Sequence, residues 1–309
     1  MQLSLFDLHC DTALRMLSSA KPLYDNPFAV SLAKAAPFER YVQVMALFTP
    51  SALSDEDGWA HMIRMWENLC ADESVTGKRA HICTDFATAS SNSPTLLLAL
   101  EDARILNRDI RRIDRLYQMG IRIITPLWSG VSCIGGAHDT DEGLSTFGKN
   151  AMLRAISIGM IPDISHASER SADAIFELAA HALRPVIASH SNAFAVCPVS
   201  RNLRDRQIQC ILDTHGVIGI NLYTRFLRKD GNADVTDVLR HMEYFLAHGA
   251  RDSLCLGCDM DGSELPVELS DVSRLPRLAE EMLKQNYSED LIRAIFFENA
   301  YQFAKKYLN

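Results

Sequence analysis

Short apolar runs recur along the chain, and stretches with helical periodicity separate most of them. Each run is short enough for a strand and is bounded by turn or polar residues. The runs cover residues 3–8, 41–48, 95–100, 121–127, 160–165, 185–189, 216–222 and 253–258. Asp102–Met119 and Ala167–His181 have the spacing of amphipathic helices. Near-continuous apolar strands that alternate with such helices predict a parallel sheet covered by helices.

Eight repeats of this kind fit a closed (β/α)8 TIM barrel. An open doubly wound sheet is the alternative, but no Gly-x-Gly-x-x-Gly sequence follows any of the runs. No low-complexity linker divides the chain, so we expect residues 1–309 to form a single domain. The long stretch between the first two strands and the loop 129–145 are expected to lie on the functional face of the barrel.

Composition narrows the classes of function. The 309 residues are 48% hydrophobic and 23% charged, with a net charge of −8, as in a soluble globular enzyme with a large core. No basic stripe of the kind that nucleic-acid binding needs is present. The first residues run into a predicted strand and not into a leader, and no apolar run approaches the roughly 20 residues of a membrane span. We therefore expect a soluble, cytoplasmic protein without a nucleic-acid or membrane partner.

The eight cysteines are scattered, which argues against a dense disulfide framework. Cys255 and Cys258 form a single Cys-x-x-Cys, but no second pair completes a zinc knuckle. Both fall within the apolar run 253–258, which favours core packing over redox or metal chemistry.

Acidic and imidazole side chains stand where five of the eight predicted strands end. They are His9 and Asp11 after the first strand, Glu101 after the third, His166 after the fifth, His190 after the sixth and Asp259 after the eighth. Residues two apart on a strand point to one face, and the active site of such a barrel lies at the carboxyl ends of its strands. The alternative is that each of these residues caps the helix that follows its strand. Asp is a good helix N-cap, but Glu and His are poor ones. The set therefore predicts a metal site at the end of the barrel where the carboxyl ends of the strands meet.

Three histidines and three carboxylates suit Zn²⁺ or a similar divalent ion. One catalytic ion needs only three protein ligands, whereas two ions about 3.5–4 Å apart that share a carboxylate would use the whole set. We expect His9 and Asp11 to hold one ion and His166 and His190 to hold the other. Glu101, which arrives between the two pairs, is the natural bridge.

A water that bridges two divalent ions loses a proton near neutral pH and becomes a hydroxide nucleophile. Asp259 would orient this hydroxide, accept its proton and pass the proton to a leaving amine. The predicted chemistry is metal-assisted hydrolysis without an organic cofactor.

In its candidate residues and motifs, the chain resembles the membrane dipeptidase (renal dipeptidase) family, within the amidohydrolase-like barrel hydrolases. The resemblance spans nearly the whole sequence, and its motifs are specific in this order and spacing. They are HCDT (9–12), Glu101, GLSTFGK (143–149), DISHAS (163–168), PVIASHSNAFAVCPVSRN (185–202), GCDMDG (257–262) and the C-terminal segment 269–303.

The resemblance implies hydrolysis of dipeptides at a centre of two zinc ions, with tolerance for a D-residue at the C-terminal side. It implies that Arg201 forms a paired hydrogen bond with the C-terminal carboxylate of the substrate, as a guanidinium fork can. It places the acid–base aspartate in GCDMDG, and we assign the role to Asp259 and not to Asp261. Tyr223, at the end of the seventh strand, is either a pocket residue or a core aromatic.

The sequence departs from the family pattern at two positions. Many members have a histidine just after the fourth strand that polarises the scissile carbonyl, and this chain has Trp128 there. An indole N–H donates one hydrogen bond but carries no charge. His138, ten residues on, is either a substitute or a solvated loop residue. Asp102 follows Glu101 where a small residue is usual. Trp128 leaves the metal ligands intact and bears on substrate choice and catalytic efficiency.

Two rival classes follow from the same sequence. Another barrel hydrolase, such as a lactonase, amidase or deaminase, would commonly use a His-x-His start or a carboxylated lysine, and neither is present. A non-catalytic binding barrel would lack at least one ligand, whereas all six positions are filled. The sequence does not give the preferred dipeptide, its stereochemistry or the native divalent metal, and a homodimer is compatible with it.

Overall fold

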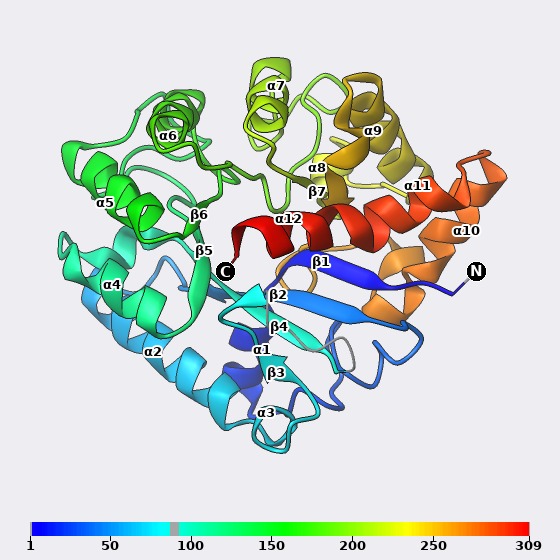
Figure 1. The fold of residues 1–309 in the computed structure, drawn as a ribbon, viewed down its shortest axis with the longest axis horizontal. Coiled ribbons are helices and arrows are strands. Elements are labelled where there is room, and N and C mark those ends of the chain that lie inside the picture. The colour runs from blue at the N-terminus through cyan, green and yellow to red at the C-terminus, as the bar shows by residue number, and fades with distance from the viewer. Residues whose placement is uncertain (1, 87–92, 309) are drawn as a thin grey trace.

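The strands form one parallel sheet that curls around a central axis in the computed structural model, which describes residues 2–86 and 93–308. The strands are β1 Leu5–Cys10, β2 Tyr41–Phe48, β3 His81–Ile82, β4 Thr95–Glu101, β5 Ile121–Thr125, β6 Ile161–Pro162, β7 Ile218–Ile220 and β8 Leu254–Leu256. Their order in the sheet is β6-β5-β4-β2-β1-β8-β7, and the short β3 pairs with β4 outside this path (Figure 1).

The predicted strand 185–189 closes the ring between β6 and β7. It does so by isolated parallel bridges, Asp163 with Ile187 and Ala188 with Ile218, and not by a continuous ladder. The fold is therefore the predicted (β/α)8 barrel. Most of the predicted strands are longer than the observed ones, because the residues at their ends leave the hydrogen-bonded ladder. The last residues lead into the loops of the mouth, by which we mean the end of the barrel at the carboxyl ends of the strands.

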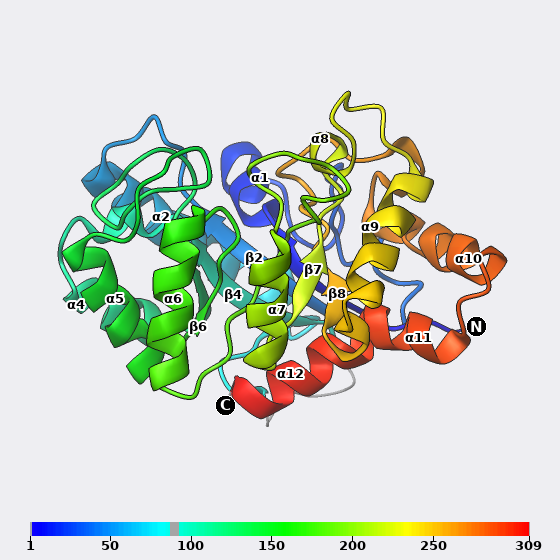
Figure 2. The ribbon, with the colours of Figure 1, turned by 90° about the horizontal axis from the view of Figure 1, so that it is seen from above.

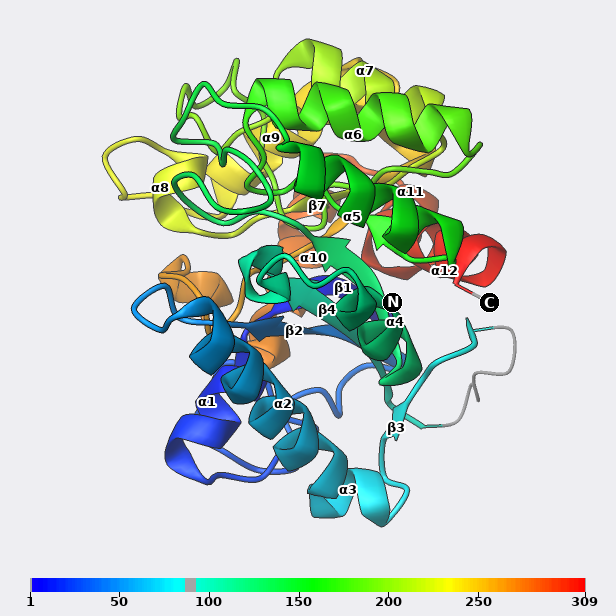
Figure 3. The same cartoon turned by 90° about the vertical axis from the view of Figure 1, so that its left-hand side faces the viewer.

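Helices surround the strands (Figure 3). They are α1 Thr12–Ser19, α2 Asp55–Ala71, α3 Glu73–Thr76, α4 Arg111–Gln118, α5 Thr146–Ser157, α6 Glu169–His181, α7 Asp205–Asp213, α8 Thr224–Leu227, α9 Val235–Ala247, α10 Pro276–Lys284, α11 Glu289–Arg293 and α12 Asn299–Tyr307, with a π-helical turn at Ala294–Glu298 and short 3₁₀ turns at Ala103–Leu106, Ala250–Asp252, Val267–Leu269 and Val272–Arg274. Within the described residues, no helix is long and apolar enough to cross a membrane.

The apolar interior has two parts. The larger one lies between the strands and the outer helices, and the smaller one fills the barrel. Phe297 and Phe303, from the π-helical turn and α12, pack against Phe6 of β1 and its neighbours in this smaller cluster. The C-terminal helix thus closes the amino end of the barrel, and the loops that follow the strands lie at the opposite end (Figure 2). This leaves the mouth open for a site.

A register shift in β1 turns His9 toward the barrel axis. Leu8 packs inside the barrel and Cys10 packs outside it, although strict alternation would put both on one face. The shift lies between Asp7 and Cys10 on the β2 side, where two steps on β2 match three on β1. His9 therefore reaches the interior by a bulge. Glu101 needs no bulge, because it continues the inward alternation of β4.

Some predicted boundaries are wrong for local reasons. The predicted helix Asp102–Met119 is split into a 3₁₀ turn and α4, because Asn107 and Arg108 have left-handed φ values of 46° and 60°. Ser168, whose side chain accepts from the Ser171 N–H, starts the next predicted helix two residues late, at Glu169. Cys258 lies beyond β8, yet it is buried as expected, and all eight cysteines are free thiols.

A buried histidine on α9 makes the stability of the barrel depend on pH. The Nδ1 of His241 accepts from the Ala193 N–H and its Nε2 donates to the Leu227 carbonyl, each at 3.0 Å. Burial lowers the pKa of His241 from 6.5 to about 4. The unfolded chain therefore takes up this proton first as pH falls, so the stability contribution is complete above about pH 6.5 and is lost toward about pH 4.

His241→Gln tests this dependence, because glutamine keeps one acceptor and one donor but does not titrate. We expect wild-type metal-free protein to be more stable than the variant near pH 7, and the difference to shrink by about 2–3 kcal/mol toward about pH 4.5. Urea unfolding at the two pH values measures it. A difference that does not change with pH would show that His241 does not carry the effect.

Candidate metal centre

The first and last strands of the barrel are joined at the mouth. The Asp11 N–H donates to the Met260 carbonyl at 2.9 Å, and the Asp259 N–H donates to the His9 carbonyl at 3.2 Å. A Cβ atom on Gly262 would lie only 2.0 Å from Asp11 Oδ2, so a side chain at this position would displace the Asp11 carboxylate. These contacts bring residues from the two ends of the sequence into one site.

Glu101 lies at the centre of the predicted ligands and is 3% exposed. Its Oε2 is 3.5 Å from His9 Nε2, and its Oε1 is 3.1 Å from His166 Nε2. The same Oε1 is 3.6 Å from His190 Nε2. Oε2 of Glu101 therefore faces His9, and Oε1 faces His166 and His190.

Two buried polar atoms at this position have no hydrogen-bond partner. They are His9 Nε2 and Asp11 Oδ1. Unpartnered buried polar atoms are costly and uncommon in folded proteins. His9, Glu101 and His190 form one group that could hold a metal ion, and His9, Asp11 and Asp259 form another. Nitrogen and carboxylate donors of this kind fit divalent zinc.

His166 and His190 present ring nitrogens to each other. The two Nε2 atoms are 3.0 Å apart. His166 Nδ1 lies 3.0 Å from the carbonyl oxygen of Trp128, and because a carbonyl can only accept, Nδ1 carries the hydrogen. The lone pair of His166 Nε2 is then directed at His190 and Glu101, where a cation can accept it.

Charges and burial together shift the pKa values of these groups in opposite directions. Burial raises the pKa of Glu101, but the positive charge of His9 outweighs it and holds this pKa below its usual range. Burial lowers the pKa of His9, but the charges of Glu101 and Asp11 raise it well above the usual value. Burial and the charge of Arg201 lower the pKa of His166 to about 4. His166 is therefore neutral near pH 7, as a metal-binding imidazole must be.

Asp259 lies beside this cluster in a setting suited to proton transfer. Its Oδ1 is 3.9 Å from His9 Nε2, and its Oδ2 accepts from Asn221 Nδ2 at 3.1 Å. Burial, with the charges of Asp11 and Glu101, raises its pKa to about 7 against the opposing charge of His9. Asn221 is a site residue that the sequence analysis missed, although it follows β7 at the position where other strands carry candidate ligands.

The neighbouring Asp261 has a different role in the geometry. It accepts from Thr12 Oγ1 at 2.6 Å and from the Ala29 and Val30 N–H groups at 2.7 and 3.3 Å. These bonds tie the excursion after α1 to the loop after β8. The contacts of Asp261 thus support the choice of Asp259 as the acid–base candidate.

Arg201 is a buried cation beside the cluster. It is 4% exposed, and it donates to Ser191 Oγ at 2.9 Å and to the His190 carbonyl at 3.1 Å. Its Nε has no partner, and no ion pair within residues 2–86 and 93–308 includes it. Burial lowers its pKa to about 10, so it stays charged near neutral pH. A buried guanidinium without a carboxylate is a favourable place for an anionic ligand.

Trp128, which departs from the family pattern, and His138 both lie close to His166. Trp128 packs against Phe48, with ring centroids 5.0 Å apart, and its ring is 6.2 Å from that of His166. The ring of His138 is 5.9 Å from that of His166, and His138 Nδ1 is 2.9 Å from Ser200 Oγ. His138 therefore lies at the rim of the cluster.

The other two predicted residues lie further out. Asp102 is buried but bonds to Arg104 Nε at 2.9 Å, so its side chain is directed away from the ligands. Tyr223 is half-buried and packs edge-on against Phe226, which in turn lies under the Arg201 guanidinium. Tyr223 thus supports the arginine indirectly.

His166 and Asp259 both have left-handed backbone conformations, with φ values of 69° and 61°. This conformation costs about 1–3 kcal/mol at a residue with a side chain and is found at functional sites.

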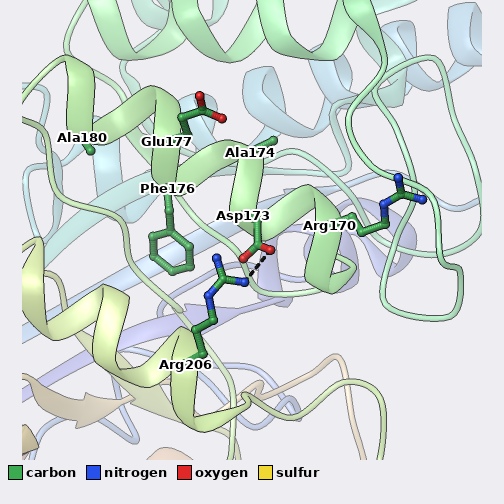
Figure 4. Close-up of a pocket in the computed structure, with 7 residues that line it drawn as sticks. All are labelled: Arg170, Asp173, Ala174, Phe176, Glu177, Ala180 and Arg206. Carbon is green, nitrogen blue, oxygen red and sulfur yellow. Dashed lines mark hydrogen bonds and ion pairs between the residues drawn. The ribbon is translucent and has the colours of Figure 1, made fainter.

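One surface depression lies away from the cluster, and another borders it. A groove of about 600 Å³ between α6 and α7 contains the Arg206–Asp173 ion pair, and no predicted site residue lines it (Figure 4). A second depression of about 390 Å³ is lined by His138, Ser200 and Arg204 and thus adjoins the mouth.

The chain is similar to known proteins over most of its length. The model of the membrane dipeptidase family (peptidase family M19) matches residues 1–307. An uncharacterised protein of Klebsiella pneumoniae is 32% identical over 76% of this chain and 93% of its own length. An uncharacterised dipeptidase of Schizosaccharomyces pombe is 27% identical over 77% of this chain and 56% of its own length.

A solved structure extends this similarity to three dimensions. It is a metallopeptidase of Rhodobacter sphaeroides, liganded with a phosphinate mimic of the dipeptide L-Ala-D-Ala. It is 25% identical, with a TM-score of 0.92 over 99% of this chain and 100% of that one.

Proposed function

Because the chain belongs to the membrane dipeptidase family and is a hydrolase of the metallo-dipeptidase type, we propose that it hydrolyses dipeptides at a centre of two zinc ions. His9 and Asp11 hold one ion in this proposal, and His166 and His190 hold the other. Glu101 is shared between them. Other divalent metals with similar ligand preferences could take the place of zinc.

The observation that carries the proposal is the position of Glu101. One of its oxygens faces His9 and the other faces His166 and His190. One ion could be held by His9, Glu101 and His190 together, but it would leave Asp11 and His166 unused, whereas two ions that share Glu101 engage the whole set. The unpartnered His9 Nε2 and Asp11 Oδ1 point to the same need for a cation.

Two ions at this position would supply Lewis acidity and lower the pKa of water held there. Asp259 can accept the proton of that water, because its carboxylate lies beside the proposed metal ligand His9. The same carboxyl group then returns the proton to the amine that leaves. Asn221 holds the Asp259 side chain in place by donating to its Oδ2.

Arg201 accounts for a preference for dipeptides. Its buried charge has no carboxylate partner within the part of the chain that the structure describes, and we assign the C-terminal carboxylate of the substrate to it. A longer peptide would place its carboxylate too far from the cluster, and a dipeptide amide has none. The Rhodobacter sphaeroides relative binds a mimic of L-Ala-D-Ala, which supports tolerance for a D-residue at the C-terminal side.

Arg201→Ala tests the substrate class. We expect KM for dipeptides to rise by about 10²-fold, because a buried charge-assisted bond is typically worth several kcal/mol and is already made in the ground state. The native enzyme should discriminate against dipeptide amides, and the variant should not. Kinetics on one dipeptide and its amide measure both effects.

Arg204→Ala is the matched control, since Arg204 lies nearby but pairs with Glu169 at 2.9 Å. It should leave KM within a few-fold of the native value. Equal native rates on the dipeptide and its amide would reject the carboxylate clamp and would favour an amidase. A screen of L,L-, L,D- and D,D-dipeptides then determines the stereochemical preference.

A further inference from the structure

A hydrogen-bond chain leads from the buried carboxylate of Asp163 to the imidazole of His190. Ser189 Oγ is 2.5 Å from Asp163 Oδ2 and 2.7 Å from His190 Nδ1. All three residues are at most 2% exposed, so bulk water does not compete with these bonds. None of the motifs considered in the sequence assigns a role to Asp163 or Ser189.

Asp163 is held firmly by four donors. Its Oδ1 accepts from the Ser165 and Ser189 N–H groups, each at 2.9 Å. Its Oδ2 accepts from Thr125 Oγ1 at 2.6 Å as well as from Ser189 Oγ. The carboxylate thereby links the ends of β5 and β6 to the segment that carries His190.

The chemistry of the donors and acceptors sets the direction of the chain. A carboxylate accepts hydrogen bonds, so Ser189 gives its one hydroxyl hydrogen to Asp163. Ser189 can then only accept from His190, and Nδ1 of His190 must carry a hydrogen. The lone pair of His190 is therefore on Nε2, which lies 3.6 Å from Glu101 Oε1.

We propose that Ser189 and Asp163 are positioning residues that fix the tautomer of His190 and so present its Nε2 lone pair to a metal ion. The inference rests on the proposed function, in which His190 is a ligand. Partners of the second ring nitrogen commonly orient metal-binding histidines, and their loss weakens metal binding by about 10–100-fold.

The neighbouring histidine is oriented in another way. His166 Nδ1 donates to the main-chain carbonyl of Trp128, which a substitution at that position leaves in place. Side-chain substitutions in the Asp163–Ser189 pair therefore act on His190 and spare His166. This asymmetry predicts that they weaken binding of one ion and not of both.

Two substitutions perturb the chain differently. Ser189→Ala removes the acceptor and leaves the tautomer of His190 free. In Asp163→Asn, the new amide can donate to Ser189 Oγ, and the hydroxyl then donates to His190 Nδ1. The ring hydrogen moves to Nε2, in front of the ion. We expect about 10-fold weaker binding of one zinc ion in Ser189→Ala and a larger loss, toward about 100-fold, in Asp163→Asn.

Thr125→Val is the matched control. It removes another hydroxyl bond to the same Asp163 oxygen, at a similarly buried position, but it cannot change the hydrogen on His190. It should lower the unfolding free energy of the metal-free protein without weakening zinc binding. If Ser189→Ala does not fold, Ser189→Cys keeps the shape and replaces the hydroxyl with a weakly bonding thiol.

The measurement is titration of metal-free protein with Zn²⁺ against a competing chelator, together with urea unfolding of the same samples. Weaker binding of one ion in the Ser189 and Asp163 variants, with native affinities in Thr125→Val, supports the inference. Native affinities in both variants, or an equal loss in Thr125→Val, overturn it. Wild-type protein that binds no zinc would instead reject the proposed function itself.

Discussion

Glu101→Gln is expected to empty the metal centre and abolish most of the activity. Glutamine keeps the size of the side chain but removes the negative charge that two dications share. Because Lewis-acid stabilisation is worth several kcal/mol, kcat/KM should fall by about 10³-fold or more. Elemental analysis should show the loss of metal in parallel with the loss of dipeptide turnover.

Asp102→Asn provides a close control for this variant. Asp102 is the next residue and is also buried, but its carboxylate pairs with Arg104 at 2.9 Å. This substitution should leave the metal content unchanged. Two retained ions and full turnover in Glu101→Gln would reject the shared carboxylate.

Asp259→Asn is expected to separate metal binding from proton transfer. Asparagine preserves the shape and the acceptor for Asn221 but cannot take up a proton. The variant should keep its metal ions while kcat falls by about 10²–10⁴-fold, as for a lost general base. Metal analysis and steady-state kinetics on one sample measure the two properties.

Asp261→Asn decides between the two aspartates of the same loop. Its side chain serves Thr12 and the backbone at Ala29 and Val30, so the substitution should lower stability and leave kcat near the native value. A large loss of kcat in Asp261→Asn, with native turnover in Asp259→Asn, would reverse the assignment.

The barrel was predictable because its strands are near-continuous apolar runs and each is followed by a helix or a turn. Polar residues at the strand ends predicted the cluster, since parallel strands bring their carboxyl ends together. The Nε2 atoms of His9, His166 and His190 each lie within 3.6 Å of a carboxylate oxygen of Glu101. Asn221 directly follows β7, so the same reasoning predicts it as a residue of the site.

Other features could not be read from local patterns. The inward direction of His9 depends on a register shift between β1 and β2. No residue type within β1 indicates this shift. The break in the predicted helix at Asn107 depends on left-handed backbone angles that helical periodicity does not report. The partners of Asp163 come from three separate strands, which meet only in the folded barrel. The bond from Ser189 to Asp163 therefore could not be predicted from the sequence.

The most direct test of the central claim is the number of ions that activity requires. Metal-free protein, titrated with Zn²⁺ and assayed on a dipeptide, should regain full activity only as the second equivalent per chain is added. Elemental analysis of the reconstituted protein should then give two ions. Full activity at one equivalent, or dipeptide hydrolysis by the metal-free protein, would contradict a centre of two ions bridged by Glu101.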